Sequence, residues 1–192
     1  MQCFVQFVTD NMAQLPGQTA PDAVADLSRV LREGGVYAAL RFLNDRTRHR
    51  YTGAYLFDPP RLVNYCLFDR DNPGVRSMSD LVLRDSYCAL VAEDGEEFIT
   101  NDALRDRRLA SHPKQRLTVA YHGHALRDDT GECFGSLCHW DTRPRLLAAT
   151  EAPLLRAAAG LIARVVCRDT SLDLLLSANA AKSPAREGLS AR

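Results

Sequence analysis

The sequence predicts an α+β fold: a mainly antiparallel sheet of five to six strands with helices packed on one face. Apolar residues recur at helical spacing near both ends, in 21–32 and again in 154–166. Between these stretches, short apolar or alternating runs are separated by turns rich in Asp, Asn, Pro and Gly, as expected for strands. Strands joined by short turns favour antiparallel pairing, and helices at both ends can cover one face of the sheet.

The first helix is expected over Pro21–Arg32. Pro21 suits the first turn, where a missing N–H does no harm, and Asp22 places a negative charge at the positive end of the helix dipole. Gly34-Gly35 is expected to end this helix. Residues 1–19 before it are treated as an N-terminal extension. The apolar stripe of the helix consists of Val24, Leu27, Val30 and Leu31.

Three strands are expected next, at 36–43, 51–57 and 62–68, because these runs are rich in apolar and aromatic residues. A partly helical segment is expected over 78–92. A short strand follows at 98–100, before a charged stretch with no regular pattern.

A hairpin is expected to close the sheet, with strands at 117–125 and 132–140 joined by a polar turn that contains Gly. The side chains of its second strand must alternate between two faces. One face would look into the helix-packed core and the other toward a pocket. Phe134, Ser136, Cys138 and Trp140 share one face, and Gly135, Leu137 and His139 share the other.

The last helix is expected to begin after Thr150, a suitable N-cap residue. Its strong apolar stripe runs from Leu154 to Val166. The folded domain is therefore placed at 20–168, and 169–192 is expected to be a C-terminal extension. From about residue 177 this extension has almost no large apolar side chain, which predicts disorder.

Composition excludes several classes of protein. The 192 residues suffice for one domain with tails, and the 24 Lys and Arg balance the 24 Asp and Glu. This balance predicts no general attraction to nucleic acid or to an anionic membrane. No apolar run is long enough to span a membrane, and the N-terminus lacks the basic region of a signal peptide. A cytoplasmic location is expected, and the six scattered cysteines are expected to be mostly reduced.

Three short motifs occur in order along the chain. The first is Ser86-Tyr87-Cys88, and the second is Asn101-Asp102-Ala103 followed by Asp106 and Arg108-Leu109. The third starts at Tyr121 and Gly123 and continues through the run Gly135-Ser136-Leu137-Cys138 to Asp141 and Pro144-Arg145. These motifs and their order resemble the GAF domain family, and the resemblance covers roughly Pro21 to Arg168. It departs from the family at Ala125, where a Pro is usual, and at His139, where an aliphatic residue is common.

The resemblance implies a GAF-like fold, of the same general kind as PAS and profilin domains. It implies helices on one side of the sheet and a ligand pocket on the other. Members of the family sense small molecules, bind tetrapyrroles or dimerise, and fold alone does not choose among these roles.

Nine residues are candidates to contact a ligand, because they fall on the motifs or on strands expected near the pocket. Polar groups on a loop over an apolar sheet can orient a ligand, although such a loop can also be a solvated surface. Arg105, Arg107 or Arg108 on this loop could pair with a carboxylate or phosphate. The nine candidates are Tyr55, Tyr87, Cys88, Asn101, Asp102, Asp106, Tyr121, His139 and Asp141.

The cysteines and histidines invite two chemical interpretations. Metal binding is disfavoured, because Cys138 and His139 must point to opposite faces of one strand. Cys88 could be a reactive thiol or a small packing residue, and Asp85 beside it would raise the thiol pKa. Free methionine sulfoxide reductases of the resembled family use pocket cysteines, but their Gly-rich cysteine segments are not found in this sequence.

The sequence therefore favours a stand-alone small-molecule sensor that acts in signalling through a partner protein or as a homodimer, without catalysis of its own. No Ser-His-Asp set, phosphate-binding Gly loop or Glu-rich metal cluster indicates an enzyme. The ligand and any cofactor stay unidentified. Three alternatives remain: a thiol-dependent redox sensor or reductase, a structural module that dimerises through its terminal helices, and a tetrapyrrole binder.

Overall fold

The structure is a computed structural model that describes residues 20–182, with side chains placed for 21–169. In chain order the helices and strands are α2 (Ala20–Asp45), β1 (Tyr51–Asp58), β2 (Arg61–Asp69), β3 (Leu81–Val82), α3 (Cys88–Asp94), β4 (Glu97–Thr100), β5 (Ala120–Arg127), β6 (Cys133–Asp141) and α4 (Glu151–Lys182). There are also two short 3-10 turns, Leu83–Asp85 and Arg107–Leu109.

The six strands form one antiparallel sheet in the order β3-β2-β1-β6-β5-β4. Two hairpins, β1-β2 and β5-β6, lie side by side, and β1 pairs with β6 to join them. The centre of the sheet is therefore built from strands that are far apart in sequence. This arrangement confirms the predicted α+β class, the antiparallel sheet and its number of strands.

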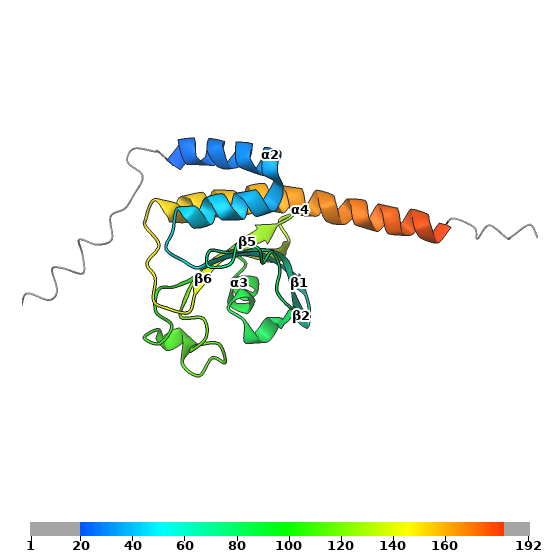
Figure 1. Cartoon of the computed structure of the whole chain (residues 1–192). Helices are drawn as coiled ribbons and strands as arrows, with labels where there is room; N and C mark the ends of the chain where they lie inside the picture. The colour runs from blue at the N-terminus through cyan, green and yellow to red at the C-terminus, as the bar shows by residue number, and fades with distance from the viewer. Residues whose placement is uncertain (1–19, 183–192) are drawn as a thin grey trace, which may run out of the picture.

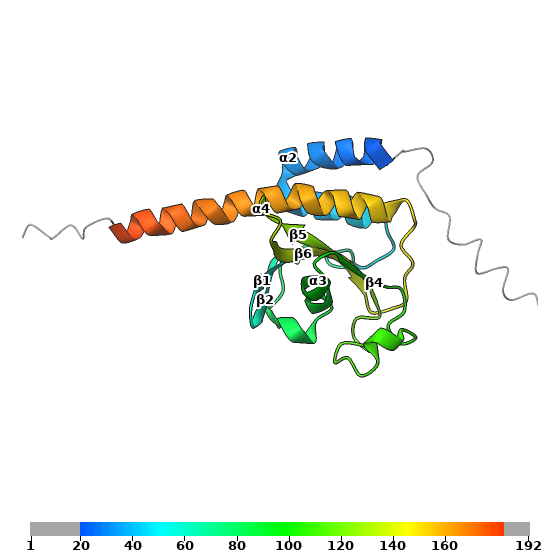
Figure 2. The ribbon, with the colours of Figure 1, turned by 180° about the vertical axis from the view of Figure 1, so that it is seen from behind.

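Helices α2 and α4 lie together on one face of the sheet, and α3 lies on the opposite face (Figures 1 and 2). The face under α2 and α4 holds the larger core, with Leu27, Leu40, Leu137 and Ile162 all fully buried. The other face holds a second core that is richer in aromatic side chains. The expected helix-covered face is thus present, and α3 belongs to the pocket side.

The predicted strand at 36–43 is wrong, because this segment is the second half of α2. As predicted, Gly35 ends the first helical segment: its backbone is not helical, with φ 69° and ψ −169°, and α2 consists of two helical segments that meet at this residue (Figure 1). Val36, Ala39, Leu40 and Leu43 are buried at a spacing of three and four residues, which is the period of a helix. Their rich apolar content suggested a strand, but their spacing was the better indicator.

The segment 78–92 is helical in part, as expected. Leu83–Asp85 forms a 3-10 turn, and α3 begins at Cys88 and ends at Gly95 in the left-handed conformation. Leu81–Val82 was not expected as a strand but pairs with β2 at the edge of the sheet.

Helix α4 extends beyond the sheet as a long projecting rod (Figure 1). It continues to Lys182, past residue 177, where the sequence predicts disorder to begin. The rest of that stretch, and the N-terminal extension at 1–19, lie outside the described residues. No helix in the described part is long and apolar enough to cross a membrane, and the cytoplasmic location stays a prediction.

Candidate functional site

A cavity of about 160 Å³ lies on the side of the sheet away from α2 and α4. Its walls come from strands β1, β2, β3, β5 and β6, from α3 and the residues just before it, and from the loop that precedes β5. Four of the nine predicted site residues line it, namely Tyr55, Tyr87, Cys88 and Tyr121. The other lining residues are Leu62, Met78, Leu81, Ser86, Lys114, Leu117, Thr118 and Trp140.

The floor of the cavity is built around Cys138 in the central strand β6. Gly53 and Gly123 are the neighbours of Cys138 on the two flanking strands. The ring of Tyr55 covers Gly53, where a Cβ would lie 2.7 Å from the ring, and the ring of Tyr121 covers Gly123 in the same way. Glycine at both positions therefore lets two tyrosine rings lie flat on the sheet beside Cys138.

Cys88 is the first residue of α3, and its thiol faces the same side of the sheet as Cys138. Tyr121 Oη donates a hydrogen bond to Cys88 Sγ at 3.3 Å. A hydrogen bond from Cys138 is the largest cause that lowers the pKa of the Cys88 thiol, to about 7, with Tyr121 adding to it and burial opposing it. Asp85, expected to raise this pKa, is not among the main causes, and the net shift is downward. Burial raises the pKa of Cys138 well above its usual range.

Tyr87 carries a polar group that nothing in the described structure satisfies. Its side chain is 2% exposed, and its hydroxyl has no hydrogen-bond partner among the described residues. Burial, with a smaller effect of Asp106, raises its pKa to about 12, so the hydroxyl stays protonated and can donate. A buried hydroxyl without a partner costs about 1–3 kcal/mol, and a bound ligand could recover this cost.

Sequence reasoning missed the residues with which two irregular segments contribute to the lining of the cavity. Met78 accepts a hydrogen bond from Tyr55 Oη at 3.2 Å, and Lys114, Leu117 and Thr118 come from the loop before β5. That loop follows a charged segment without a periodic pattern, so no local signal indicated its position. Trp140 could have been found, because alternation along β6 places it on the same face as Cys138.

The predicted polar loop performs local structural tasks instead of lining the cavity. Asp102 accepts from the backbone N–H of Leu104 at 3.1 Å, and Asp106 accepts from that of Arg108 at 3.0 Å. The Arg108 guanidinium also pairs with Asp106 and lowers the pKa of that carboxyl to about 2. Asn101 contributes its backbone carbonyl, which accepts from the N–H of Arg145 at 3.0 Å.

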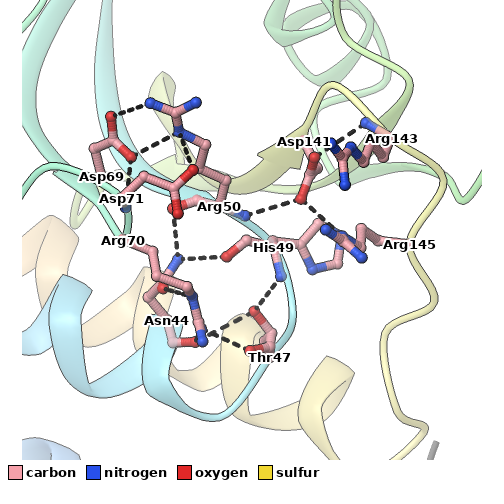
Figure 3. Close-up of polar contacts among 10 residues, drawn as sticks. All are labelled: Asn44, Thr47, His49, Arg50, Asp69, Arg70, Asp71, Asp141, Arg143 and Arg145. Atoms are coloured by element: carbon pink, nitrogen blue, oxygen red, sulfur yellow. Dashed lines mark hydrogen bonds and ion pairs between the residues drawn. The ribbon is translucent and has the colours of Figure 1, made fainter. Parts of the chain in front are cut away.

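Asp141 lies in a polar network at the end of β6 and not in the cavity (Figure 3). Its carboxylate accepts from the backbone N–H groups of Arg50 and Arg143, at 3.1 and 3.0 Å, and from Arg145 Nε at 2.7 Å. Asp69 forms a similar bidentate pair with Arg50. Asp141 therefore ties the start of β1 to the chain that leaves β6, which is a structural role.

His139 is placed on the opposite face from the cavity, so its prediction as a ligand contact is not supported by this geometry. It belongs to a group of four histidines buried on the helix-covered face: His49, His122, His124 and His139. Phe134 also packs on that side, although simple alternation places it with Cys138. A register shift at this end of the β5-β6 pair accounts for the difference.

The histidine group stays uncharged at neutral pH. His49 packs against His122 and His139, with ring centroids 5.0 and 5.6 Å apart. Burial lowers the pKa of His49 to about 3 and that of His122 to about 4, and it lowers those of His124 and His139 as well. Within the described residues, no group of three or more His, Cys, Asp or Glu is placed to hold a metal ion.

Comparison with solved structures identifies the fold. The GAF domain of a phosphoenolpyruvate-protein phosphotransferase from Acinetobacter matches with a TM-score of 0.65 and 14% identity, over 79% of this chain and 94% of that one. A free methionine-R-sulfoxide reductase from Neisseria meningitidis, solved with its substrate, matches with a TM-score of 0.58 and 16% identity, over 76% and 86%. The chromophore-binding domain of a bacteriophytochrome from R. palustris gives 0.62 and 10%, over 79% and 61%.

These likenesses establish that the chain has the GAF-domain fold, as the order of its motifs predicted. At such low identity they establish the fold and no particular ligand or reaction. Comparison of the sequence with protein-family models finds no match, and comparison with curated proteins finds none at the level of significance applied. Fold and cavity together define a GAF-fold domain with a cavity on the face of the sheet opposite α2 and α4.

Proposed function

We propose that this protein is a sensor that binds one small molecule in the cavity and acts through its terminal helices on a second copy or a partner protein. The observation that carries this proposal is the buried, unpartnered hydroxyl of Tyr87 in the wall of a mainly apolar cavity. Few placed polar groups in an apolar pocket are typical of small-molecule sites.

The lining indicates the chemistry of the ligand. Aromatic and aliphatic side chains form most of the wall, and Lys114 is the charged side chain among the described residues that line it. A cavity of about 160 Å³ is near the volume of roughly 150 Å³ that accommodates benzene in a protein core. A small aromatic ring that carries one carboxylate fits this size, the apolar wall and the ammonium group of Lys114.

A route from the cavity to the helices runs through the thickness of a single sheet. Tyr55 and Cys138 face the cavity, whereas the adjacent Ala54 and Leu137 pack in the core under α2 and α4. A ligand that moves the tyrosine rings therefore acts on strands whose other face supports both helices. The long projecting end of α4 is suited to carry such a movement to a partner.

Size argues against a tetrapyrrole in the present form of the cavity. Pockets for drug-sized ligands measure about 300–1,000 Å³, and a tetrapyrrole is larger than most such ligands. A thiol-dependent activity has a specific observation in its favour, the packing of Cys88 and Cys138 in one buried cluster beside the cavity.

A thermal-shift series tests the proposed ligand class. Benzoate, benzyl alcohol and benzylamine share one ring and differ in charge, so the melting temperature should rise most with benzoate and least with benzylamine. Lys114→Gln should remove the preference for benzoate over benzyl alcohol. Arg116→Gln in the same loop, at an exposed residue that does not line the cavity, is the matched control. Equal shifts for all three compounds would contradict the proposed charge recognition.

A further inference from the structure

Two of the cysteines are brought together by elements that are distant in sequence. Cys88 begins α3 and Cys138 lies in the middle of β6, and both are buried, with 4% and 1% exposure. Helix α3 packs directly on β6. Both side chains belong to the same buried cluster, and Tyr121, whose hydroxyl is bonded to Cys88 Sγ, lies over Gly123 beside Cys138.

The two thiols differ in their access to small molecules. Cys88 is part of the cavity lining, whereas Cys138 lies in the floor beneath it. Tyr121 Oη is hydrogen-bonded to Cys88 Sγ at 3.3 Å, which stabilises negative charge on that sulfur. The wall around Cys88 is otherwise mainly apolar. A small oxidant that enters the cavity therefore meets Cys88 first, with Cys138 directly behind it.

The other described cysteines lack this environment. Cys66, Cys133 and Cys167 are half-buried, and burial raises the pKa of each thiol. The lowered pKa of Cys88 makes a larger share of its thiol available as thiolate near neutral pH. Reactivity toward an oxidant should thus be concentrated at Cys88.

We infer that Cys88 and Cys138 are a redox pair, in which a small hydroperoxide oxidises Cys88 and Cys138 closes a reversible disulfide across the floor of the cavity. The disulfide itself rests on the packing of Cys88 and Cys138 in one buried cluster where α3 meets β6. Its consequence for ligand binding rests on the function proposed above.

The chemistry balances with a hydroperoxide as oxidant. The Cys88 thiolate attacks the outer peroxide oxygen, the O–O bond breaks, and water leaves (an alcohol for an organic hydroperoxide) as Cys88 becomes a sulfenic acid. Cys138 sulfur then attacks Cys88 sulfur, the S–O bond breaks, and the hydroxide leaves as water with the Cys138 proton. The two thiols lose two electrons in total, which the peroxide gains, and an external dithiol reverses the change.

Disulfide formation must alter the cavity. The two sulfur atoms approach to about 2.05 Å, and Cys88 loses the thiolate that accepts from Tyr121. The Tyr121 ring then loses its anchor over Gly123 and moves into or away from the ligand space. Oxidation is therefore expected to weaken benzoate binding at least fivefold.

The test is a disulfide map of the full chain after treatment with hydrogen peroxide. Remaining thiols are alkylated under denaturing conditions, and the digest is examined by mass spectrometry. A linked pair of peptides that contain Cys88 and Cys138, lighter by two hydrogens and lost on treatment with dithiothreitol, is expected. Full alkylation of both residues after peroxide, or sulfinic acid on Cys88 without the link, would overturn the inference.

Variants separate the two roles. Cys138→Ser should leave a sulfenic acid on Cys88 that dimedone traps, and Cys88→Ser should leave Cys138 unmodified. Cys133→Ser, on the same strand, is the matched control and should keep the link. Oxidation of Cys138 in Cys88→Ser as fast as in the unaltered protein would overturn the order of attack. The map of the unaltered protein decides the main point even if a variant does not fold.

The regulatory part has its own readout. Benzoate affinity is compared for the reduced and the oxidised protein by the emission of Trp140, the single tryptophan of the chain. Equal affinities would overturn the regulatory part alone. If the disulfide forms and benzoate binds neither state, the proposed ligand class is wrong and the redox pair stands.

Discussion

At the scale of single residues, the floor of the cavity depends on two glycines whose lack of a side chain makes room for tyrosine rings. Gly53 and Gly123 flank Cys138 in the sheet, and each is covered by the ring of a tyrosine two residues away. Three strands therefore present one thiol between two aromatic rings. A side chain at either glycine would push a ring out of the floor, at a cost of about 1–3 kcal/mol for overpacking.

Tyr87 provides the prediction at this scale. Tyr87→Phe removes a buried hydroxyl without a partner, so the free energy of unfolding should stay equal or rise by up to about 1 kcal/mol. Benzoate should nevertheless bind about fivefold more weakly, because roughly 1 kcal/mol of hydrogen bonding to the ligand is lost. Urea unfolding and thermal shift of the same samples measure both effects. A variant that is less stable and binds benzoate equally well would show that the hydroxyl serves the fold and not the ligand.

At the scale of elements, sequence reasoning succeeded where turn chemistry and strand alternation are strong. The β5-β6 hairpin and the start of the last helix were predicted within a few residues, and Cys138 and His139 do lie on opposite faces. It failed at 36–43, because the apolar content of this run favours a strand, whereas its buried residues recur at the spacing of a helix. The polar loop at 101–106 was assigned to the cavity for its composition, whereas its carboxylates satisfy nearby backbone N–H groups.

The kink in α2 gives the prediction at this scale. Gly35 has φ 69° and ψ −169°, a region that is almost confined to glycine. A Cβ at this position would have no neighbour within 4 Å, so the cost of Gly35→Ala is purely conformational, about 1–3 kcal/mol.

Gly160 in α4 is the matched control, because a Cβ there also has no neighbour within 4 Å but the backbone is helical. Gly160→Ala should stabilise the protein by about 0.5–1 kcal/mol. Thermal unfolding of both variants measures the contrast. Equal stability for the two would mean that the backbone at Gly35 relaxes into the helix without loss.

At the scale of the whole molecule, the fold separates two kinds of interior. One face of the sheet carries the cavity with its tyrosines and thiols, and the other carries four uncharged histidines beside the core of α2 and α4. The hydrogen bonds around Asp141 lie at the end of β6 and connect it to Arg50, just before β1 (Figure 3). Proton uptake therefore acts on the helix-covered face, whereas ligand and oxidant act on the other.

The histidines predict how stability depends on pH. Their pKa values are lowered in the folded state, to about 3 for His49 and about 4 for His122, against about 6.5 in the unfolded chain. Above pH 6.5 both states are neutral at these groups and stability is constant. As the pH falls from 6.5 toward 4 the unfolded state takes up protons first, so stability declines by up to about 1.4 kcal/mol per pH unit and histidine.

Urea unfolding between pH 7 and pH 5 measures this dependence and stays above about pH 5, where the stabilisation by Asp69 and Asp106, with lowered pKa values, begins to be lost. His122→Gln should make the decline shallower in this window. An unchanged slope in this variant would contradict the assignment of the effect to the buried histidines.

The central claim is that the cavity takes up a small aromatic carboxylate. Trp140 lines the cavity, stacks on Tyr51 with ring centroids 3.7 Å apart, and is the single tryptophan of the chain. Titration of the reduced protein with benzoate, followed by the emission of Trp140, is therefore the most direct measurement. We predict a saturable change in emission that is weaker in Tyr87→Phe and in Lys114→Gln. An emission that benzoate, benzyl alcohol and benzylamine all leave unchanged up to millimolar concentration would contradict the claim.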